Sequence, residues 1–274
     1  MPELPEVETV RRFLASRLPG ERIESIEPLL PRVIRGCAPE AFRAALEGRA
    51  FAAAERKGKY LVLRTDGPQS LLVHLRMTGR LTWQGDKGAP LPPYARVVFR
   101  LSGGTLVYGD VRTLGELRLI PSVGRTGVTG FDALGPDAIG PEFTAEGLAR
   151  ALRGSRRAVK AFLLDQANVA CIGNIYADEA LFRAGILPSR PACDVTPEEA
   201  SRLRDAVRGV MEESLARGGT TFRDFRDAEG KKGGNAPALQ VYGRDGLPCP
   251  KCGTRLEFSK IAGRGTRFCP RCQN

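Results

Sequence analysis

Hydrophobic residues recur with two different periods along the first half of the chain. From Pro5 to Leu18 they recur at helical spacing, and Pro19 and Gly20 end the pattern, which predicts one helix near the N-terminus. Beyond it the chain carries short runs rich in β-branched and aromatic residues, separated by turn sequences with Gly, Pro and Asp. The predicted strands are residues 60–63, 71–75, 96–101 and 105–108. Their spacing is typical of an antiparallel β-sandwich or barrel.

The second half of the chain has a helical pattern. Residues 121–141 contain eight Gly or Pro residues and are predicted to form a linker. Thr196 and Glu199 stand at the N-cap and N3 positions of a helix start, so a long helix is expected from there to a point before Gly218. Two further helices are expected on either side of residues 166–173.

The charge of the chain points to an anionic partner. Its 274 residues include 42 Lys or Arg and 31 Asp or Glu, a formal net charge of +11. Nucleic acid is the usual partner of such a basic protein. A membrane is a weaker interpretation, because no apolar run approaches the length of a bilayer span and the acidic N-terminus has no apolar signal core. We therefore expect a protein that binds no membrane, and the odd number of seven cysteines fits a reducing cytoplasm better than a disulfide scaffold.

Four of the seven cysteines form a metal-binding pattern. Cys249 and Cys252 are separated by two residues, as are Cys269 and Cys272, and sixteen residues lie between the two pairs. Two such CxxC knuckles can supply four thiolates to one tetrahedral, structural Zn²⁺ ion. The residues between them are expected to form a hairpin with too little core to fold alone, so zinc should supply much of its stability. The alternative, two redox-active CxxC pairs, lacks the βαβ context that such motifs usually have.

The N-terminus carries a second candidate chemistry. Removal of Met1 would leave Pro2 with a secondary amine, and because a free α-amino group has a pKa near ~8, a nucleophilic fraction exists at neutral pH. Attack of this amine on an aldehyde carbon gives an iminium ion, as in Schiff-base catalysis. Glu3 is placed to move protons for the same reaction. The alternative is that Pro2 and Pro5 only stiffen the start of the chain.

Together these motifs resemble those of the bacterial formamidopyrimidine-DNA glycosylases, which excise oxidised purines and then cut the DNA strand. The resemblance runs nearly from end to end of the chain. It rests on residues 1–12 (MPELPEVETVRR), 57–60 (KGKY), 74–79 (HLRMTG), 173–179 (GNIYADE) and 240–244 (QVYGR), the last of which leads into the cysteine pattern.

The resemblance implies an α+β, multidomain fold. An N-terminal helix and an antiparallel β-sandwich or barrel would be followed by a helix–two-turn–helix domain that ends in a zinc-ribbon hairpin. The expected parts are a catalytic β-sandwich domain (1–120), a linker (121–141), a helical DNA-binding domain (142–244) and a zinc ribbon (245–274).

The resemblance also implies roles for individual residues. Pro2 would be the nucleophile at C1′ of the damaged nucleotide, and Glu3 the acid that protonates the opening sugar ring. Lys59 would hold a phosphate near the lesion and assist proton transfer, whereas from its position alone it is a solvated lysine at a strand end. Asn174, where a helix is expected to begin, and Arg264, between two glycines at the ribbon tip, would hold phosphates. Without the family, Asn174 is a plain N-cap and Arg264 an exposed arginine.

A base inside a duplex must leave the stack before an enzyme can act on it, and an inserted side chain can fill the gap. By resemblance the filling residues are Met77, Arg112 and Leu114. The chain departs from the family here, with Val111 where proline is usual and Leu114 where an intercalating phenylalanine is usual. Leucine stacks less well, so the search for damage is expected to differ. A second departure, at residues 170–173, replaces the family's double glycine and puts the geometry of that turn in question.

Two further features complete the comparison with the family. The polar stretch between Thr220 and Val241 corresponds to the loop that folds over flipped 8-oxoguanine, and its glycines permit movement. His74, the only histidine, is interpreted as a hydrogen-bonded structural residue rather than a catalyst.

The sequence thus predicts a bifunctional enzyme of base-excision repair. It would remove 8-oxoguanine and formamidopyrimidines through a Pro2 Schiff base and then cut the strand by β,δ-elimination at the abasic site. The expected partner is double-stranded DNA with oxidised bases or abasic sites, the expected cofactor is one Zn²⁺ ion, and a monomer in the bacterial cytoplasm, at the nucleoid, is expected. Two alternatives remain open: an endonuclease VIII-type glycosylase that prefers oxidised pyrimidines, and a zinc-ribbon DNA-binding protein without catalysis.

Overall fold

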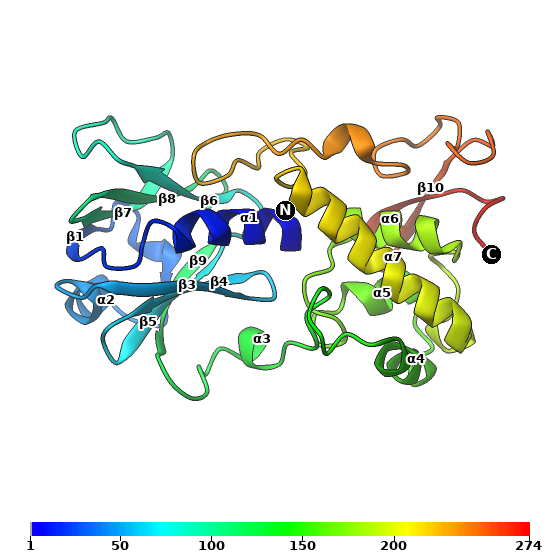
Figure 1. Cartoon of the computed structure of the whole chain (residues 1–274), viewed down its shortest axis with the longest axis horizontal. Helices are drawn as coiled ribbons and strands as arrows, with labels where there is room; N and C mark the ends of the chain where they lie inside the picture. The colour runs from blue at the N-terminus through cyan, green and yellow to red at the C-terminus, as the bar shows by residue number, and fades with distance from the viewer. Residues whose placement is uncertain (1) are drawn as a thin grey trace. The chain divides into compact units, whose positions relative to one another are not determined.

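The computed structural model describes residues 2–274, and Met1 lies outside the described residues. The chain forms two compact units, one from residues 2–132 with 217–234 and the other from 133–216 with 235–274 (Figure 1). The predicted domain boundaries stay predictions. The segment 217–234 falls within the predicted helical domain of residues 142–244, and in the structure it packs with the first unit.

The first unit is a β-sandwich with a helix at its start, as the hydrophobic pattern predicts. Helix α1 spans Leu4–Ala15 and ends three residues before the expected end at Leu18, although Leu18 is still buried. One antiparallel sheet has the order β1-β7-β8-β6, from β1 (Ile23–Glu27), β6 (Gly79–Gln84), β7 (Ala95–Leu101) and β8 (Gly104–Asp110). The other has the order β2-β9-β5-β4-β3, from β2 (Ile34–Arg35), β3 (Phe51–Lys57), β4 (Tyr60–Thr65), β5 (Gln69–His74) and β9 (Glu116–Pro121).

One correction concerns the second sheet. Strands β2 and β9 pair in parallel, so this sheet is mixed rather than wholly antiparallel. The chain between β1 and β3 also holds the 3₁₀ turn η1 (Pro31–Val33) and helix α2 (Pro39–Leu46). Val10 of α1, Leu61 and Val73 of one sheet and Phe99 and Leu106 of the other belong to a single core and have no exposed surface. This shared core fixes the strand ends that carry the candidate site residues.

The second unit is helical and ends in a two-stranded ribbon. Its helices are α4 (Ala145–Arg153), α5 (Val159–Leu164), α6 (Asn174–Ala184) and α7 (Pro197–Ala216), with the short 3₁₀ turns η2 (Ala192–Asp194) and η3 (Ala236–Ala238). The ribbon is β10 (Glu257–Ile261) paired antiparallel with β11 (Arg264–Phe268). Helices α5 and α6 flank residues 166–173 as predicted.

The start of α7 confirms its predicted capping box. The Glu199 backbone N–H donates to Thr196 Oγ1 (3.3 Å), and the Thr196 backbone N–H donates to the Glu199 carboxylate (2.9 Å). The helix ends at Ala216, before Gly218 with its positive φ of 72°. None of the described helices combines the length and the apolar character needed to cross a membrane.

The predicted linker and the predicted mobile loop are both more structured than their composition suggests. In the linker, helix α3 (Thr129–Asp132) places Phe131 edge-on against Tyr60, with 5.4 Å between the ring centroids. In the segment 217–234, Ala228 has no exposed surface and its carbonyl accepts the Trp83 backbone N–H (2.9 Å). Thr220 and Gly234 pair across the base of the segment. The segment is therefore anchored at its base and at its middle.

Candidate active site and nucleic-acid-binding elements

The predicted nucleophile and acid lie at the start of α1. Pro2 and Glu3 are both buried, and Glu3 has 2% of its surface exposed. One oxygen of the Glu6 carboxylate accepts the Glu3 backbone N–H (2.7 Å), and the other accepts the Thr220 backbone N–H (2.7 Å). Gly219 permits this approach, because its φ is +86° and an added Cβ would lie 3.1 Å from the Glu6 side chain. Glu6 therefore ties the backbone at Glu3 to the base of the segment 217–234.

Glu6 was missed by the sequence analysis. The signal was present, because a glutamate three residues after an N-cap position is the N3 member of a capping box. Nothing in the sequence, however, indicated that its second oxygen meets Thr220, which follows more than two hundred residues later.

Lys59, directly before β4, and His74, at the end of β5, are buried at the same end of their sheet, because Tyr60 and His74 are paired. Lys59 is 5% exposed and His74 is 7% exposed, so Lys59 is not a solvated strand-end lysine. His74 Nδ1 accepts the Arg76 backbone N–H (3.0 Å), which confirms the predicted structural hydrogen bond. Burial first, and then the positive charges of Arg76 and Lys59, lower the pKa of His74 to about 3. The imidazole is therefore neutral at physiological pH, with its proton on Nε2.

The three predicted gap-filling residues lie in two neighbouring turns of the first unit. Met77 lies between β5 and β6, and Arg112 and Leu114 lie between β8 and β9. Strands β6 and β8 are paired, with Gly79 opposite Asp110, so both turns leave the sheet at the same end. Met77 is 39% exposed and Leu114 is 49% exposed, so both apolar side chains lie at the surface.

In the second unit the structure brings Asn174 and Arg264 to the same place. The N-cap of α6 is Gly173, so Asn174 is the first helical residue and not the plain N-cap of the alternative interpretation. Asn174 Nδ2 donates to the Gly265 carbonyl (3.0 Å), and Gly265 directly follows Arg264. Backbone N–H groups at a helix N-terminus and a nearby guanidinium are both groups that bind phosphate in proteins.

A buried ion pair under the ribbon was also missed by the sequence analysis. Lys160 of α5 and Asp178 of α6 have fully buried side chains, with 2.6 Å between Lys160 Nζ and Asp178 Oδ1. Lys160 Nζ also donates to the Gly265 carbonyl (2.9 Å) and to Thr266 Oγ1 (2.8 Å), and Asp178 Oδ2 accepts the Arg267 backbone N–H (3.0 Å). The pair therefore fixes β11, which Arg264 begins, to two helices.

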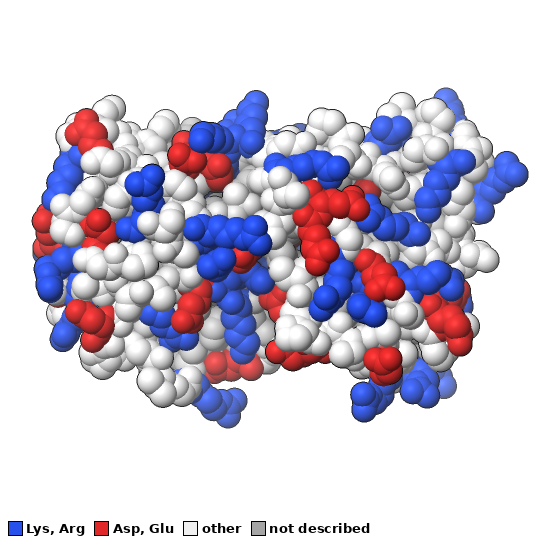
Figure 2. Space-filling view, in the orientation of Figure 1, with Lys and Arg blue, Asp and Glu red and all other residues white. Residues whose placement is uncertain are grey.

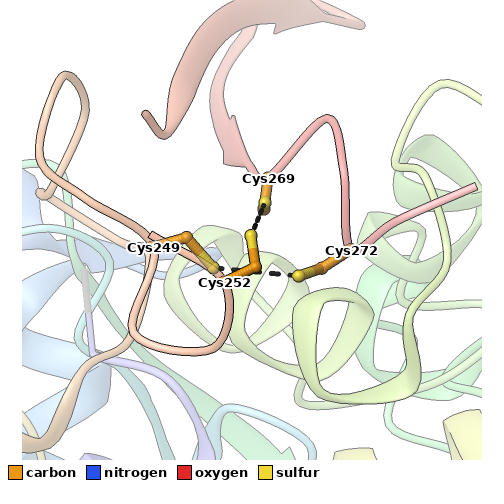
Figure 3. Close-up of side chains that lie close together, drawn as sticks. All are labelled: Cys249, Cys252, Cys269 and Cys272. Atoms are coloured by element: carbon orange, nitrogen blue, oxygen red, sulfur yellow. Dashed lines mark hydrogen bonds between the residues drawn. The ribbon is translucent and has the colours of Figure 1, made fainter. Parts of the chain in front are cut away.

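The four cysteines of the predicted zinc site lie together (Figure 3). The sulfur atoms of Cys249, Cys252, Cys269 and Cys272 all lie within 4.8 Å of one another. Cys252 and Cys269 are 3.5 Å apart, and Cys249 and Cys272 are 3.9 Å apart. Four thiolates around Zn²⁺ at about 2.3 Å would be about 3.8 Å apart, so the donor set and its spacing fit this ion.

The turn before α6 holds Cys171 in a backbone conformation that favours glycine. Cys171 has a φ of +86°, a backbone conformation that normally favours glycine. Its backbone N–H donates to Gln166 Oε1 (3.0 Å), and its thiol donates to Asp137 Oδ2 (3.1 Å). These bonds hold the cysteine in a glycine-type turn, and Cys37 and Cys193 lie elsewhere and are partly exposed.

Basic side chains are spread over the face drawn in Figure 2, with acidic side chains among them. The ribbon is more strongly basic, because residues 249–272 contain six Lys or Arg and one acidic residue. In the described structure, Arg267 of this group is held by Asp245 (2.9 Å), whereas Arg264 at the tip of the ribbon is exposed. The ribbon thus carries an excess of positive charge, and its exposed Arg264 directly precedes Gly265, whose carbonyl Asn174 contacts.

The chain thus combines a β-sandwich with a buried Pro-Glu start, a helical unit and a ribbon with four clustered cysteines. The chain matches the family models described as the formamidopyrimidine-DNA glycosylase N-terminal domain (residues 1–117), the H2TH domain of the same enzymes (134–226) and the zinc finger found in FPG and IleRS (246–274). It is 49% identical to the formamidopyrimidine-DNA glycosylase of Symbiobacterium thermophilum, over 100% of this chain and 89% of that protein. The chain belongs to the formamidopyrimidine-DNA glycosylase family.

Solved structures agree with this assignment. A mutant of Lactococcus lactis FPG in complex with Fapy-dG-containing DNA superimposes with a TM-score of 0.90 at 34% identity, covering 100% of both chains. The wild-type Lactococcus lactis FPG (MutM) with an oxidised-pyrimidine-containing DNA gives a TM-score of 0.89 at 34% identity, again over 100% of both chains. The predicted fold, with its sandwich, helix–two-turn–helix and zinc-ribbon parts, is confirmed.

Proposed function

We propose that this protein is a bifunctional DNA glycosylase of base-excision repair, which removes oxidised purines and then cuts the DNA strand at the abasic site. Its family membership over the whole chain supports the class of reaction. The observation that carries the proposal to particular residues is the buried Pro2-Glu3 start of α1, joined through Glu6 to the segment 217–234.

Pro2 supplies the nucleophile once Met1 has been removed. Glu3 protonates the ring oxygen as the C1′–O4′ bond breaks, and the lone pair of the Pro2 secondary amine forms a bond to C1′. The amine proton passes to the base, the glycosidic bond breaks, and the nitrogen lone pair forms the C=N bond of an iminium ion on the opened sugar. Loss of the 3′-phosphate and then of the 5′-phosphate completes the β,δ-elimination.

The other residues hold the DNA. Asn174 and Arg264 bind phosphates beside the N-terminus of α6, and Lys59 binds a phosphate near the lesion. Met77, Arg112 and Leu114 enter the duplex where the damaged nucleotide has left it. The Zn²⁺ ion stabilises the ribbon and takes no part in the reaction. The protein acts as a monomer in the bacterial cytoplasm, on double-stranded DNA at the nucleoid.

A preference for oxidised pyrimidines is the second candidate. It gains support from the complex of Lactococcus lactis FPG with an oxidised-pyrimidine-containing DNA. Single-turnover excision from duplexes that contain 8-oxoguanine, a formamidopyrimidine or thymine glycol decides between the two. We expect faster release of the oxidised purines, and a clear preference for thymine glycol would overturn the purine assignment.

The same assay tests the role of Glu3. The Glu3→Gln variant should release no base from the preferred duplex, because glutamine cannot supply the proton. The matched control is Glu142→Gln, which changes an exposed glutamate of the second unit and should leave the rate unchanged. Equal excision by Glu3→Gln and by the control would contradict the proposed acid.

A further inference from the structure

The turns that carry the gap-filling residues share one buried carboxylate. Asp110, at the end of β8, has 1% of its surface exposed and lies between the turn of Met77 and the turn of Arg112 and Leu114. Met77 and Leu114 at the tips of these turns are exposed, and the contacts of Asp110 hold both turns from beneath.

Each oxygen of Asp110 accepts hydrogen bonds from more than one group. Oδ1 accepts the Thr78 hydroxyl (2.5 Å), from the first turn, and the Arg112 backbone N–H (3.1 Å), from the second. Oδ2 accepts the Gly115 backbone N–H (2.8 Å) and the Tyr108 hydroxyl (3.2 Å). The Arg112 N–H also lies 3.0 Å from Thr78 Oγ1, which closes a small network between the two turns.

The packing around this carboxylate leaves little freedom. A Cβ added at Gly115 would lie 2.1 Å from the Tyr108 hydroxyl and 3.2 Å from Asp110 Oδ2, and a Cβ added at Gly79 would lie 2.5 Å from the Leu75 carbonyl. Burial, and then the negative charge of Asp110, raise the pKa of Tyr108. Its hydroxyl therefore stays protonated and keeps donating to the carboxylate.

A rigid base matters for side chains that enter a base stack. Met77 and Leu114 are 39% and 49% exposed in the described structure, so packing of their own side chains does little to fix them. A functional group that must meet its target needs a support whose geometry is set beforehand, because a loosely held side chain loses part of its binding energy to ordering. The bonds to Asp110 supply that support from beneath both turns at once.

We propose that Asp110 is a positioning residue for base extrusion, which locks the turns of Met77 and of Arg112 and Leu114 into one preformed wedge. This inference rests on the proposed function, because it assigns a cause to the geometry of the gap-filling residues. Asp110 itself does not touch DNA. Its loss should therefore impair the opening of a duplex far more than the chemistry at an abasic site that is already unstacked.

The test compares the Asp110→Asn variant with wild-type protein on two substrates. Replacing one carboxylate oxygen by an NH₂ group places a donor against donors. Excision of 8-oxoguanine from a duplex should fall about 10- to 100-fold, the range expected for the loss of a hydrogen bond to a charged group. Cleavage of an abasic site in single-stranded DNA should stay within about two-fold, because that substrate needs no wedge. Fluorescence of 2-aminopurine beside the lesion should show less unstacking in the variant.

Matched variants keep the result interpretable. Asp132→Asn changes another carboxylate that accepts backbone and hydroxyl donors, from Thr126 and Gly127, in the same unit, and it should leave both activities unchanged. Thr78→Val removes the hydroxyl that joins the two turns and should reproduce the duplex defect, and Thr78→Ser should restore activity. The Thr78 pair also tests the proposal if Asp110→Asn does not fold.

Three results would overturn the proposal: normal duplex excision and unstacking by Asp110→Asn, an equal loss on both substrates in a folded variant, or normal duplex excision by Thr78→Val. Failure of the proposed function is a different outcome. In that case wild-type protein itself would release no base, while the 2-aminopurine signal on DNA with an abasic-site analogue would still report whether Asp110 controls the wedge.

Discussion

Replacing His74 with asparagine should remove a pH dependence from the stability of the protein. His74 is the only histidine, and its pKa in the folded protein is lowered from 6.5 to about 3, mainly by burial. In the unfolded chain the imidazole keeps its ordinary pKa near 6.5. Below that pH the unfolded chain binds a proton that the folded protein does not bind. Stability is therefore lost as the pH falls from about 6.5 towards about 3.

The size of the effect follows from the width of this window. Each pH unit below the unfolded pKa costs about 1.4 kcal/mol of stability until the folded pKa is reached. Between pH ~6.5 and pH ~5 the expected loss is therefore about 2 kcal/mol. Most carboxylates titrate at lower pH than this, so the upper part of the window is well suited to the measurement.

The assay is urea unfolding of the wild-type protein and of His74→Asn, at pH values of roughly 7.5 and 5. Asparagine offers an oxygen near the position of Nδ1, so the Arg76 backbone N–H keeps an acceptor. The variant also loses the contact between His74 and Tyr60, whose ring centroids are 4.3 Å apart, and this loss lowers its free energy of unfolding by the same amount at both pH values. Protonation of the zinc thiolates is common to both proteins and cancels in the difference. The stability of wild type relative to the variant should fall by about 2 kcal/mol between the two pH values.

Parallel pH dependences would refute this reasoning. They would mean that folded His74 takes up a proton as easily as the unfolded chain does, and that its environment is far more polar than its burial indicates.

Three further predictions test other buried groups. Glu6→Gln should lower stability by about 1–3 kcal/mol and slow excision, because the amide NH₂ group faces a backbone N–H group. Urea unfolding measures the stability and a single-turnover assay measures excision, and unchanged excision would argue against the link to the segment 217–234. Lys160→Met should lower the free energy of unfolding by about 3–5 kcal/mol, because it leaves the buried Asp178 carboxylate without its lysine. The double variant Lys160→Met/Asp178→Leu should recover much of this loss in urea unfolding, and a double variant as unstable as the single one would refute the ion-pair explanation. Removal of zinc by a chelator should unfold the ribbon that carries Arg264 and so weaken DNA binding, while the helical circular dichroism signal of α4–α7 is retained. Full DNA affinity after metal loss would contradict a role for Arg264.

Local signals in the sequence predicted much of the fold. The Thr196–Glu199 capping box and the glycines after Ala216 define both ends of α7, and the CxxC spacing brings four sulfur atoms within 4.8 Å. Each of these features depends on residues close together in the chain, or on a ligand set with a fixed spacing. The segment 217–234 is different. Its polar composition predicts a free loop, and only the folded sandwich shows that Ala228 is buried against β6.

The supporting residues of the site could not be found in this way. Thr78 and Asp110 are 32 residues apart, and Lys160 and Thr266 are 106 residues apart. A buried carboxylate or lysine of this kind has no periodic pattern, because its partners come from other strands or helices. The resemblance to a family named the side chains expected to contact DNA. The groups that hold those side chains in place became visible only in three dimensions.

Borohydride trapping is the most direct test of the central claim, that the Pro2 nitrogen forms the covalent intermediate. The protein, with Met1 removed as verified by its intact mass, is incubated with a duplex containing 8-oxoguanine opposite cytosine and reduced. The matched control is a chain with one extra residue before Pro2, which turns its nitrogen into a tertiary amide. The account predicts a DNA adduct that peptide mapping locates on Pro2, and no adduct in the control. An adduct on a lysine, or trapping by the extended chain, would contradict it.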